Sequence, residues 1–90
     1  MAILGGNPKM LARDISDGFV ILNMANIRKY TNQDIHELFQ NIMIVQREIR
    51  QEQVELKDVE AVKKKQMRLQ RLFRAITTIT TYAKPRKIPL

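Results

Sequence analysis

The chain has 90 residues, a net charge of +7 and no cysteine. Because so short a chain buries only about 60% of the surface that its unfolded form exposes, we expect one domain, residues 1–90, around a single small core. The lack of cysteine excludes disulfide bonds and thiolate metal or redox sites, and it is typical of the reducing cytoplasm, where we place the protein.

Targeting and membrane segments are not expected. Residues 1–6 have neither the basic region nor the apolar run of a signal peptide. The longest apolar run, residues 19–22, is far shorter than the roughly 20 residues that cross a bilayer. We therefore expect no transmembrane segment.

Positive charge collects in the second half of the chain. Residues 57–90 hold ten Lys or Arg against two acids, net +8, whereas residues 1–56 hold six against seven, net −1. Residues 31–84 contain no Gly or Pro, the two residue types that most disfavour a helix interior. The composition therefore predicts an all-α protein with a basic C-terminal half.

The N-terminal segment, residues 1–30, has the signals of a short helical segment. Asn7 followed by Pro8 is a favourable cap and first-turn pair, and Gly18 then interrupts the pattern. Over residues 19–27 periodicity does not separate a strand from a second helical piece, and we favour the helix. The expected apolar face consists of Met10, Leu11, Ile15, Phe19 and Leu22.

A long helix is predicted to start after Thr31. Thr31 or Asn32 can accept bonds from the first free amides, and Asp34 favours the positive end of the helix dipole. Apolar residues then recur at spacings of three, four and seven, so they share one stripe. This stripe consists of Ile35, Leu38, Phe39, Ile42, Val45, Ile49 and Leu56.

A second apolar stripe follows, but it is out of phase with the first. The seven-residue series 35, 42, 49 and 56 of the first stripe would continue at Lys63, whereas the second stripe runs through positions 62, 69 and 76. One long coiled-coil helix with a jog, or an antiparallel helical hairpin that turns near Lys57, accounts for the slip. We favour the hairpin, with arms at about 32–56 and 58–82 and Asp58 capping the second arm. The second stripe consists of Val59, Val62, Leu69, Leu72, Phe73, Ile76 and Ile79.

Folding the chain at Lys57 aligns apolar layers and sets an arm of net charge −3 against an arm of net charge +4. The layers pair Ile35 with Ile79, Leu38 with Ile76, Ile42 with Leu72, and Val45 with Leu69. The lack of Gly or Pro at the turn counts against this hairpin. The residues expected to pack the arms or to form an oligomer stripe are Ile35, Leu38, Phe39, Ile42, Val45, Leu69, Leu72, Phe73 and Ile76.

The C-terminus is predicted to be an extended basic tail, residues 84–90, after a helical region of residues 31–83. Pro85 and Pro89 lack a backbone donor and bias the preceding residues toward extended geometry. The tail is either disordered or a short docking motif in which Ile88 and Leu90 fill pockets.

Residues suited to catalysis are few. The only histidine, His36, lies beside Glu37 and near Asp34, but positions 34 and 36 do not share a helix face, so we interpret it as a surface residue. The sequence has no glycine-rich phosphate loop. We expect no enzyme activity, no cofactor and no small-molecule substrate.

The strongest candidate site is a basic face on the second arm and tail. On a helix Lys64, Arg68 and Arg71 lie within about 60° of one another. Such a face suits an acidic protein partner or the phosphates of nucleic acid, or it is a solvated surface that pairs with the acidic arm. A membrane surface is disfavoured because the opposite arm uses the apolar stripe. The face consists of Lys64, Arg68, Arg71, Arg74, Lys84, Arg86 and Lys87.

These observations predict a non-enzymatic adaptor or assembly subunit that self-associates or docks on a protein partner. Nucleic-acid binding through the basic arm and tail is the alternative. We expect Phe39 and Phe73 in the core, where they cannot stack on bases.

The methionines are expected to fill gaps in the core. If the hairpin leaves an edge uncovered, however, Met43 and Met67 would join Val54, Val59 and the N-terminal segment in an apolar strip. Self-association would then bury that strip.

Overall fold

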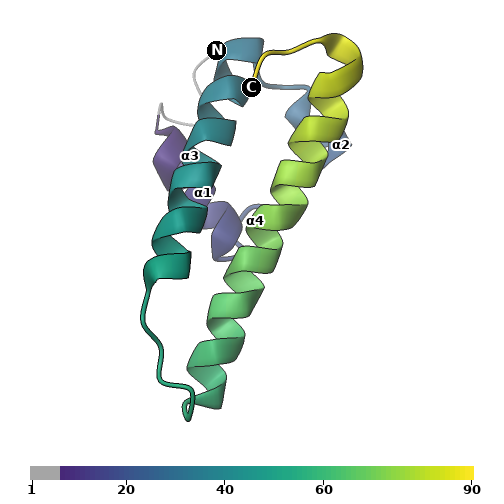
Figure 1. Ribbon diagram of the computed structural model, residues 1–90. Coiled ribbons are helices and arrows are strands. Elements are labelled where there is room, and N and C mark those ends of the chain that lie inside the picture. Colours follow the sequence, from purple (N-terminus) through teal and green to yellow (C-terminus); the bar gives the residue numbers. More distant parts are fainter. Residues whose placement is uncertain (1–6) are drawn as a thin grey trace.

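The computed structural model describes residues 7–90, so the signal-peptide expectation for residues 1–6 lies outside it. The described residues form four helices and no strand, which confirms the all-α prediction (Figure 1). None of these helices combines the length and apolar character needed to cross a bilayer. The helices are α1 (Pro8–Ser16), α2 (Met24–Ile27), α3 (Asn32–Gln51) and α4 (Val59–Arg86).

Side-chain caps start the three longer helices, as the sequence predicts. Asn7 and Asp58 each accept a bond from the backbone amide three residues later, at 3.0 and 3.1 Å. Thr31 and Asp34 form a reciprocal capping box, in which each side chain accepts the other residue's amide. These bonds satisfy amides that have no partner within the helix.

The segment after α1 turns instead of continuing as a helix. Gly18 has a φ of 85°, which a residue with a β-carbon adopts only with strain. Residues 20–23 are not helical, and the side chain of Asn23 accepts two amides to start the single turn of α2. The helical interpretation of residues 19–27 is therefore wrong except for Met24–Ile27.

Both long helices end at different residues from those predicted. α3 stops at Gln51 rather than near residue 56, and residues 52–58 form a non-helical link. Leu56, placed on the first stripe from the sequence, is 89% exposed there and gains no packing that would extend the helix.

α4 continues through Pro85 to Arg86, so the extended tail predicted for residues 84–90 is wrong over its first three residues. Thr81, whose carbonyl Pro85 leaves without its helical donor, is exposed, so water can satisfy it. The end is fixed by Lys87 in the left-handed conformation and by the Ile88 amide, which donates to Ala83. Ile88 itself is buried.

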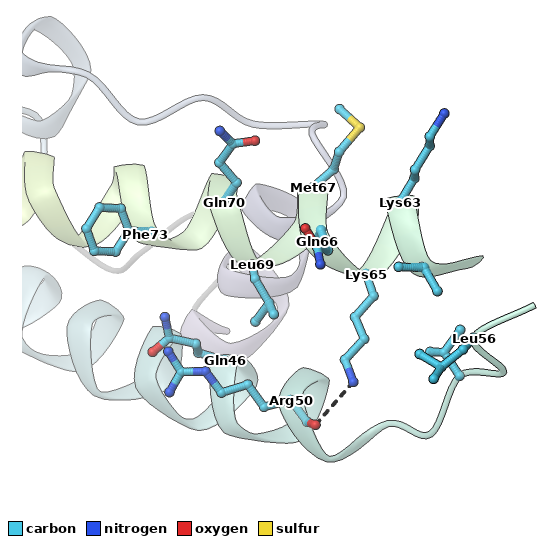
Figure 2. A pocket seen from close by; sticks show the side chains of 12 residues that line it. Gln46, Arg50, Leu56, Lys63, Lys65, Gln66, Met67, Leu69, Gln70 and Phe73 are labelled. Carbon is cyan, nitrogen blue, oxygen red and sulfur yellow. Dashed lines mark hydrogen bonds between the residues drawn. The ribbon is translucent and has the colours of Figure 1, made fainter. Parts of the chain in front are cut away.

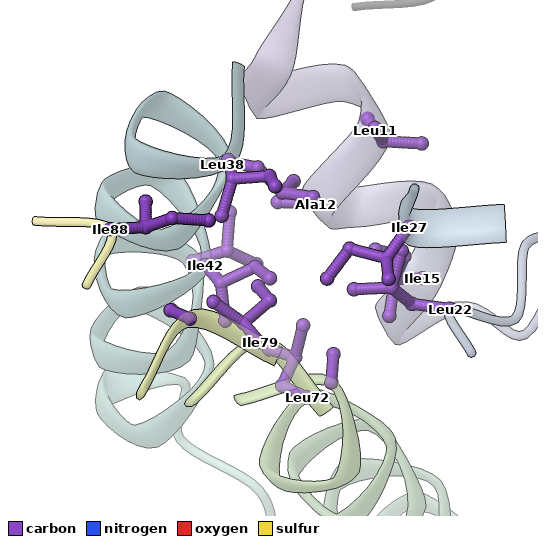
Figure 3. Packing of buried hydrophobic residues seen from close by; sticks show 14 of the residues in the cluster. Leu11, Ala12, Ile15, Leu22, Ile27, Leu38, Ile42, Leu72, Ile79 and Ile88 are labelled. Atoms are coloured by element: carbon purple, nitrogen blue, oxygen red, sulfur yellow. The ribbon is translucent and has the colours of Figure 1, made fainter. Parts of the chain in front are cut away.

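The core lies where three helices meet. α3 and α4 lie side by side and run in opposite directions, and α1 packs against both of them (Figure 1). Figure 3 shows Leu38 and Ile42 of α3 beside Leu72 and Ile79 of α4. α1 contributes Leu11, Ala12 and Ile15, and the chain around α2 adds Leu22 and Ile27.

The predicted packing residues differ in burial. Phe73 is 63% exposed, so its expected place in the core is wrong. The reason is helical phase, because the buried face of α4 is the stripe of Leu72, Ala75, Ile79 and Ala83, and Phe73 is turned about 100° from Leu72. Ile35, Leu38, Ile42, Val45 and Leu72 are buried, and Phe39, Leu69 and Ile76 are half-buried against the core.

The four methionines among residues 7–90 do not fill gaps in the core. Met10, Met24, Met43 and Met67 are all exposed, and so is Phe19, which we expected on the apolar face of the N-terminal segment. These side chains add to the apolar area that the fold leaves in contact with water.

Two ion pairs tie α1 to α3. Glu48 of α3 accepts from Lys9 at 3.0 Å and from Arg13 at 2.7 Å. The hydrogen bond from Lys9 and the two positive charges hold the pKa of Glu48 below its ordinary value.

We expect Leu72→Ala to lower the free energy of unfolding by about 2–5 kcal/mol, because it leaves a cavity in the core. The neighbouring substitution Phe73→Ala should cost less than about 1 kcal/mol, because that ring is mostly in water. Urea unfolding followed by circular dichroism measures both. Equal losses would contradict the helical phase that we describe for α4.

We expect the Glu48 ion pairs to stabilise the fold above the unfolded-state pKa of this carboxylate, with the contribution lost as pH falls through the lowered folded-state pKa. The melting temperature of the native protein should therefore exceed that of Glu48→Gln at pH 7, and the gap should close on acidification below about pH 4. Glu55→Gln, on the exposed link, is the control. A gap that persists in acid would argue against an electrostatic origin.

Candidate functional site

The first half of α4 is not part of the core. None of its side chains from residue 59 to residue 71 is buried, whereas the second half contributes Leu72, Ala75, Ile79 and Ala83 to the core. The second half of α4 is therefore held by core packing, whereas the first half has a side that no other helix of residues 7–90 covers.

An open groove of about 970 Å³ lies along this first half of α4, against the end of α3 and the link (Figure 2). We call it the α4 groove. Its apolar lining consists of Val54, Leu56, Val62, Met67, Leu69 and Phe73. Its polar lining consists of Gln46, Arg50, Lys63, Lys65, Gln66 and Gln70.

Helical spacing explains why these α4 residues share the groove. Positions 62, 66, 69 and 73 recur at intervals of four and three, so they fall on one face. In Figure 2 Leu69 and Lys65 point toward α3, and Lys63 and Met67 point away from it at the edge. The groove thus has a floor between the helices and a rim on α4.

Large apolar side chains in the groove remain in water. Leu56 is 89% exposed, Phe73 63% and Met67 50%. Burying such side chains in a complex is worth roughly 1.5–3 kcal/mol each before the costs of association. Clustered exposed apolar side chains of this kind mark interaction sites on soluble domains.

Every charged side chain that lines the groove is cationic. Lys65 is already engaged, since its ammonium donates to the carbonyls of Arg50 at 3.2 Å and Glu52 at 2.7 Å, at the negative end of the α3 dipole. Arg50 and Lys63 form no ion pair with any residue from 7 to 90. The groove therefore has two cations beside its apolar lining that form no ion pair within the described part of the chain.

The predicted basic face is distributed over separate parts of the structure. Arg68 pairs with Glu52 at 2.6 Å and so fastens α4 to the link. Arg71 donates to the carbonyl of Ser16 at 3.0 Å, and its guanidinium covers Gly18 closely. These two central cations are used to hold the fold together.

The remaining cations of the predicted face lie at other places. Lys64 and Arg74 are exposed, and Arg74 lines a small cavity of about 290 Å³ near Gly18. Arg86 stacks over Tyr82 with its guanidinium carbon 3.9 Å from the ring centre. Lys84 and Lys87 are exposed at the C-terminal end of α4, far along the helix from Lys64.

His36 lies near the C-terminus of the chain. Its side chain is half-buried, and Nδ1 is 3.2 Å from the carbonyl of Pro89. Within the described part of the chain no three His, Cys, Asp or Glu residues come together as a metal site would require.

Sequence reasoning identified only part of the groove. It named Val54 and Met67 as members of a conditional apolar strip, and both line the groove. It did not single out Gln66 or Gln70, because their role depends on where α3 ends. The available signal was the run of apolar residues Val54, Leu56, Val59 and Val62, whose spacing does not continue the core stripe.

Comparisons with known proteins give no relative. No protein-family model, no curated protein and no solved structure matches the chain.

We expect Arg71→Ala to lower the free energy of unfolding by about 1–2 kcal/mol, because it removes the bond to Ser16 and the packing over Gly18. Arg74→Ala, one turn away and exposed, should change it by less than about 0.5 kcal/mol. Thermal and urea unfolding of both variants measure the difference. If the two substitutions cost the same, Arg71 does not hold the turn at Gly18.

Proposed function

We propose that the protein is a non-enzymatic helical interaction module, an adaptor or assembly subunit, that docks on another protein chain through the α4 groove. The observation that carries the proposal is the gathering of Leu56 and Phe73, both largely exposed, in one concave surface with the half-exposed Met67 at its rim. The core of this fold is small, so burying these side chains against a partner would add substantially to the apolar area that the protein removes from water.

In this proposal α3 and α4 form an antiparallel hairpin. One end, the packed end, is filled by α1, and the other, the receptive end, is open to a partner. At the packed end, α1 fills the space between the two helices. At the receptive end, the Arg68 to Glu52 ion pair and the Lys65 bonds fasten the link to α4. These bonds hold the walls of the groove while its apolar lining stays available to a partner.

Nucleic-acid binding has less support. Its expected face depended on Arg68 and Arg71, which are engaged within the fold, and the other cations are spread along α4. Phe73 is exposed, but none of the other residues between 7 and 90 that line the groove is aromatic, so Phe73 has no second stacking platform beside it. Apolar docking explains more of the lining than phosphate binding does.

Site-specific photo-crosslinking tests the proposal. A benzophenone side chain replaces Phe73 or Met67 in the groove, and Thr80, exposed elsewhere on α4, serves as the control position. We expect a discrete covalent adduct with a protein, a partner or a second copy, from the two groove positions and not from the control. The additional substitution Leu56→Asp should remove it.

Adducts of equal yield at all three positions would mean that the groove has no special role. The absence of adducts at positions 67 and 73, under conditions in which irradiated controls of other proteins react, would reject docking through this surface.

A further inference from the structure

We propose that the occupant of the α4 groove is an amphipathic helix of a partner protein with an apolar face and an acidic flank. This inference rests on the proposed function and goes further by naming the partner's chemistry. It follows from the shape, the lining and the charge of the groove.

The length of the groove fits a short helix. Its α4 wall runs from Val62 to Phe73, which is about 16 Å at the helical rise of about 1.5 Å per residue. An amphipathic helix of about three turns covers that length and offers apolar anchors at positions i, i+3 or i+4, and i+7. The wall has apolar side chains at 62, 69 and 73, two turns and one turn apart, so it offers apolar contacts along this whole length.

The lining favours a helix over a single small ligand. The groove is open along its length, and its apolar residues come from α4 and from the link. Met67 at the edge is flexible and polarizable, so it can adjust to anchors of different shape. Gln66 and Gln70 offer hydrogen bonds to polar side chains at the border of a docked helix.

The positive charge of the groove lining favours a partner with negative charge. The charged lining residues are Arg50, Lys63 and Lys65, without an acid among them. The nearest acids on the link do not line the groove, and Glu52 is already paired with Arg68. Carboxylates on the flank of the docked helix would meet Arg50 and Lys63, which have no ion-pair partner among residues 7–90.

The positive charge of the groove also disfavours a second copy of this chain as its occupant. Two copies related by a two-fold axis would bring the same three groove cations together, in a protein whose net charge is +7. Like charges that face each other across an interface reduce affinity. A partner of opposite charge removes this cost and gains faster association.

Fluorescence anisotropy with designed peptides tests the inference on the full chain. The probe is a labelled peptide of about 14 residues, acetylated and amidated, with Leu anchors at helical spacing and Glu at the flanks. Its matched counterparts carry Gln or Lys in place of Glu. We expect the Glu peptide to bind about tenfold more tightly than the Gln peptide, and the Lys peptide to bind most weakly.

Protein variants locate the binding and its charge dependence. Lys63→Glu should lower the affinity for the Glu peptide several-fold and raise the affinity for the Lys peptide. Lys29→Glu, exposed at the other end of the molecule, is the matched control and should leave both affinities unchanged. Phe73→Asp should abolish binding, and its circular dichroism spectrum checks that it folds. Raising the salt concentration should reduce only the charge-dependent part of the peptide affinity.

The outcomes separate this inference from the function on which it rests. Equal affinity for the Glu, Gln and Lys peptides, lost on Phe73→Asp, would overturn the acidic partner and leave the groove as a docking site. A dimer in sedimentation that Phe73→Asp dissociates would instead make a second copy the occupant. Displacement of the Glu peptide by an oligonucleotide at physiological salt would favour nucleic acid. Failure of every peptide, together with an absence of groove adducts, would reject both proposals.

Discussion

The packing of α1 against both α3 and α4 is the interaction on which the rest of the structure depends. α1 is short, but Leu11, Ala12 and Ile15 occupy the space between the two long helices, and Glu48 binds it to α3 through Lys9 and Arg13. Because α1 is so much shorter than α4, it can cover only part of that helix. The position of the core follows from this difference in length, and so does the uncovered first half of α4.

The charged residues show how a basic chain keeps its helices together. Arg68 binds the carboxylate of Glu52, whereas Lys65 and Arg71 bind carbonyls at or next to helix C-termini. Positive side chains are suited to these places because the negative end of the helix dipole lies there. Arg68 and Arg71, the two central cations of the predicted basic face, therefore fasten the link and the turn at Gly18.

The sequence predicted those features that depend on nearby residues. The caps at Asn7, Thr31 and Asp58 and the all-α class follow from local chemistry, and the structure has them. The end of α3 and the exposure of Phe73 were not predictable, because they depend on whether Leu56 finds a packing partner and on which face of α4 meets the core. The groove was predicted only in outline for the same reason. An apolar run such as residues 54–62 does not reveal whether another helix will cover it.

The partial coverage of α4 also has a mechanical consequence. The helix is clamped along its second half by α1, α2 and α3, while its first half projects as a beam of about 20 Å that is tied at its tip by the link. A tilt of about 10° at the edge of the clamp moves the tip by roughly 3 Å, because the displacement grows with the length of the beam. The spacing of the groove walls therefore depends on the angle of α4, and the bonds from Lys65 and Arg68 to the end of α3 and to the link oppose any change in that angle.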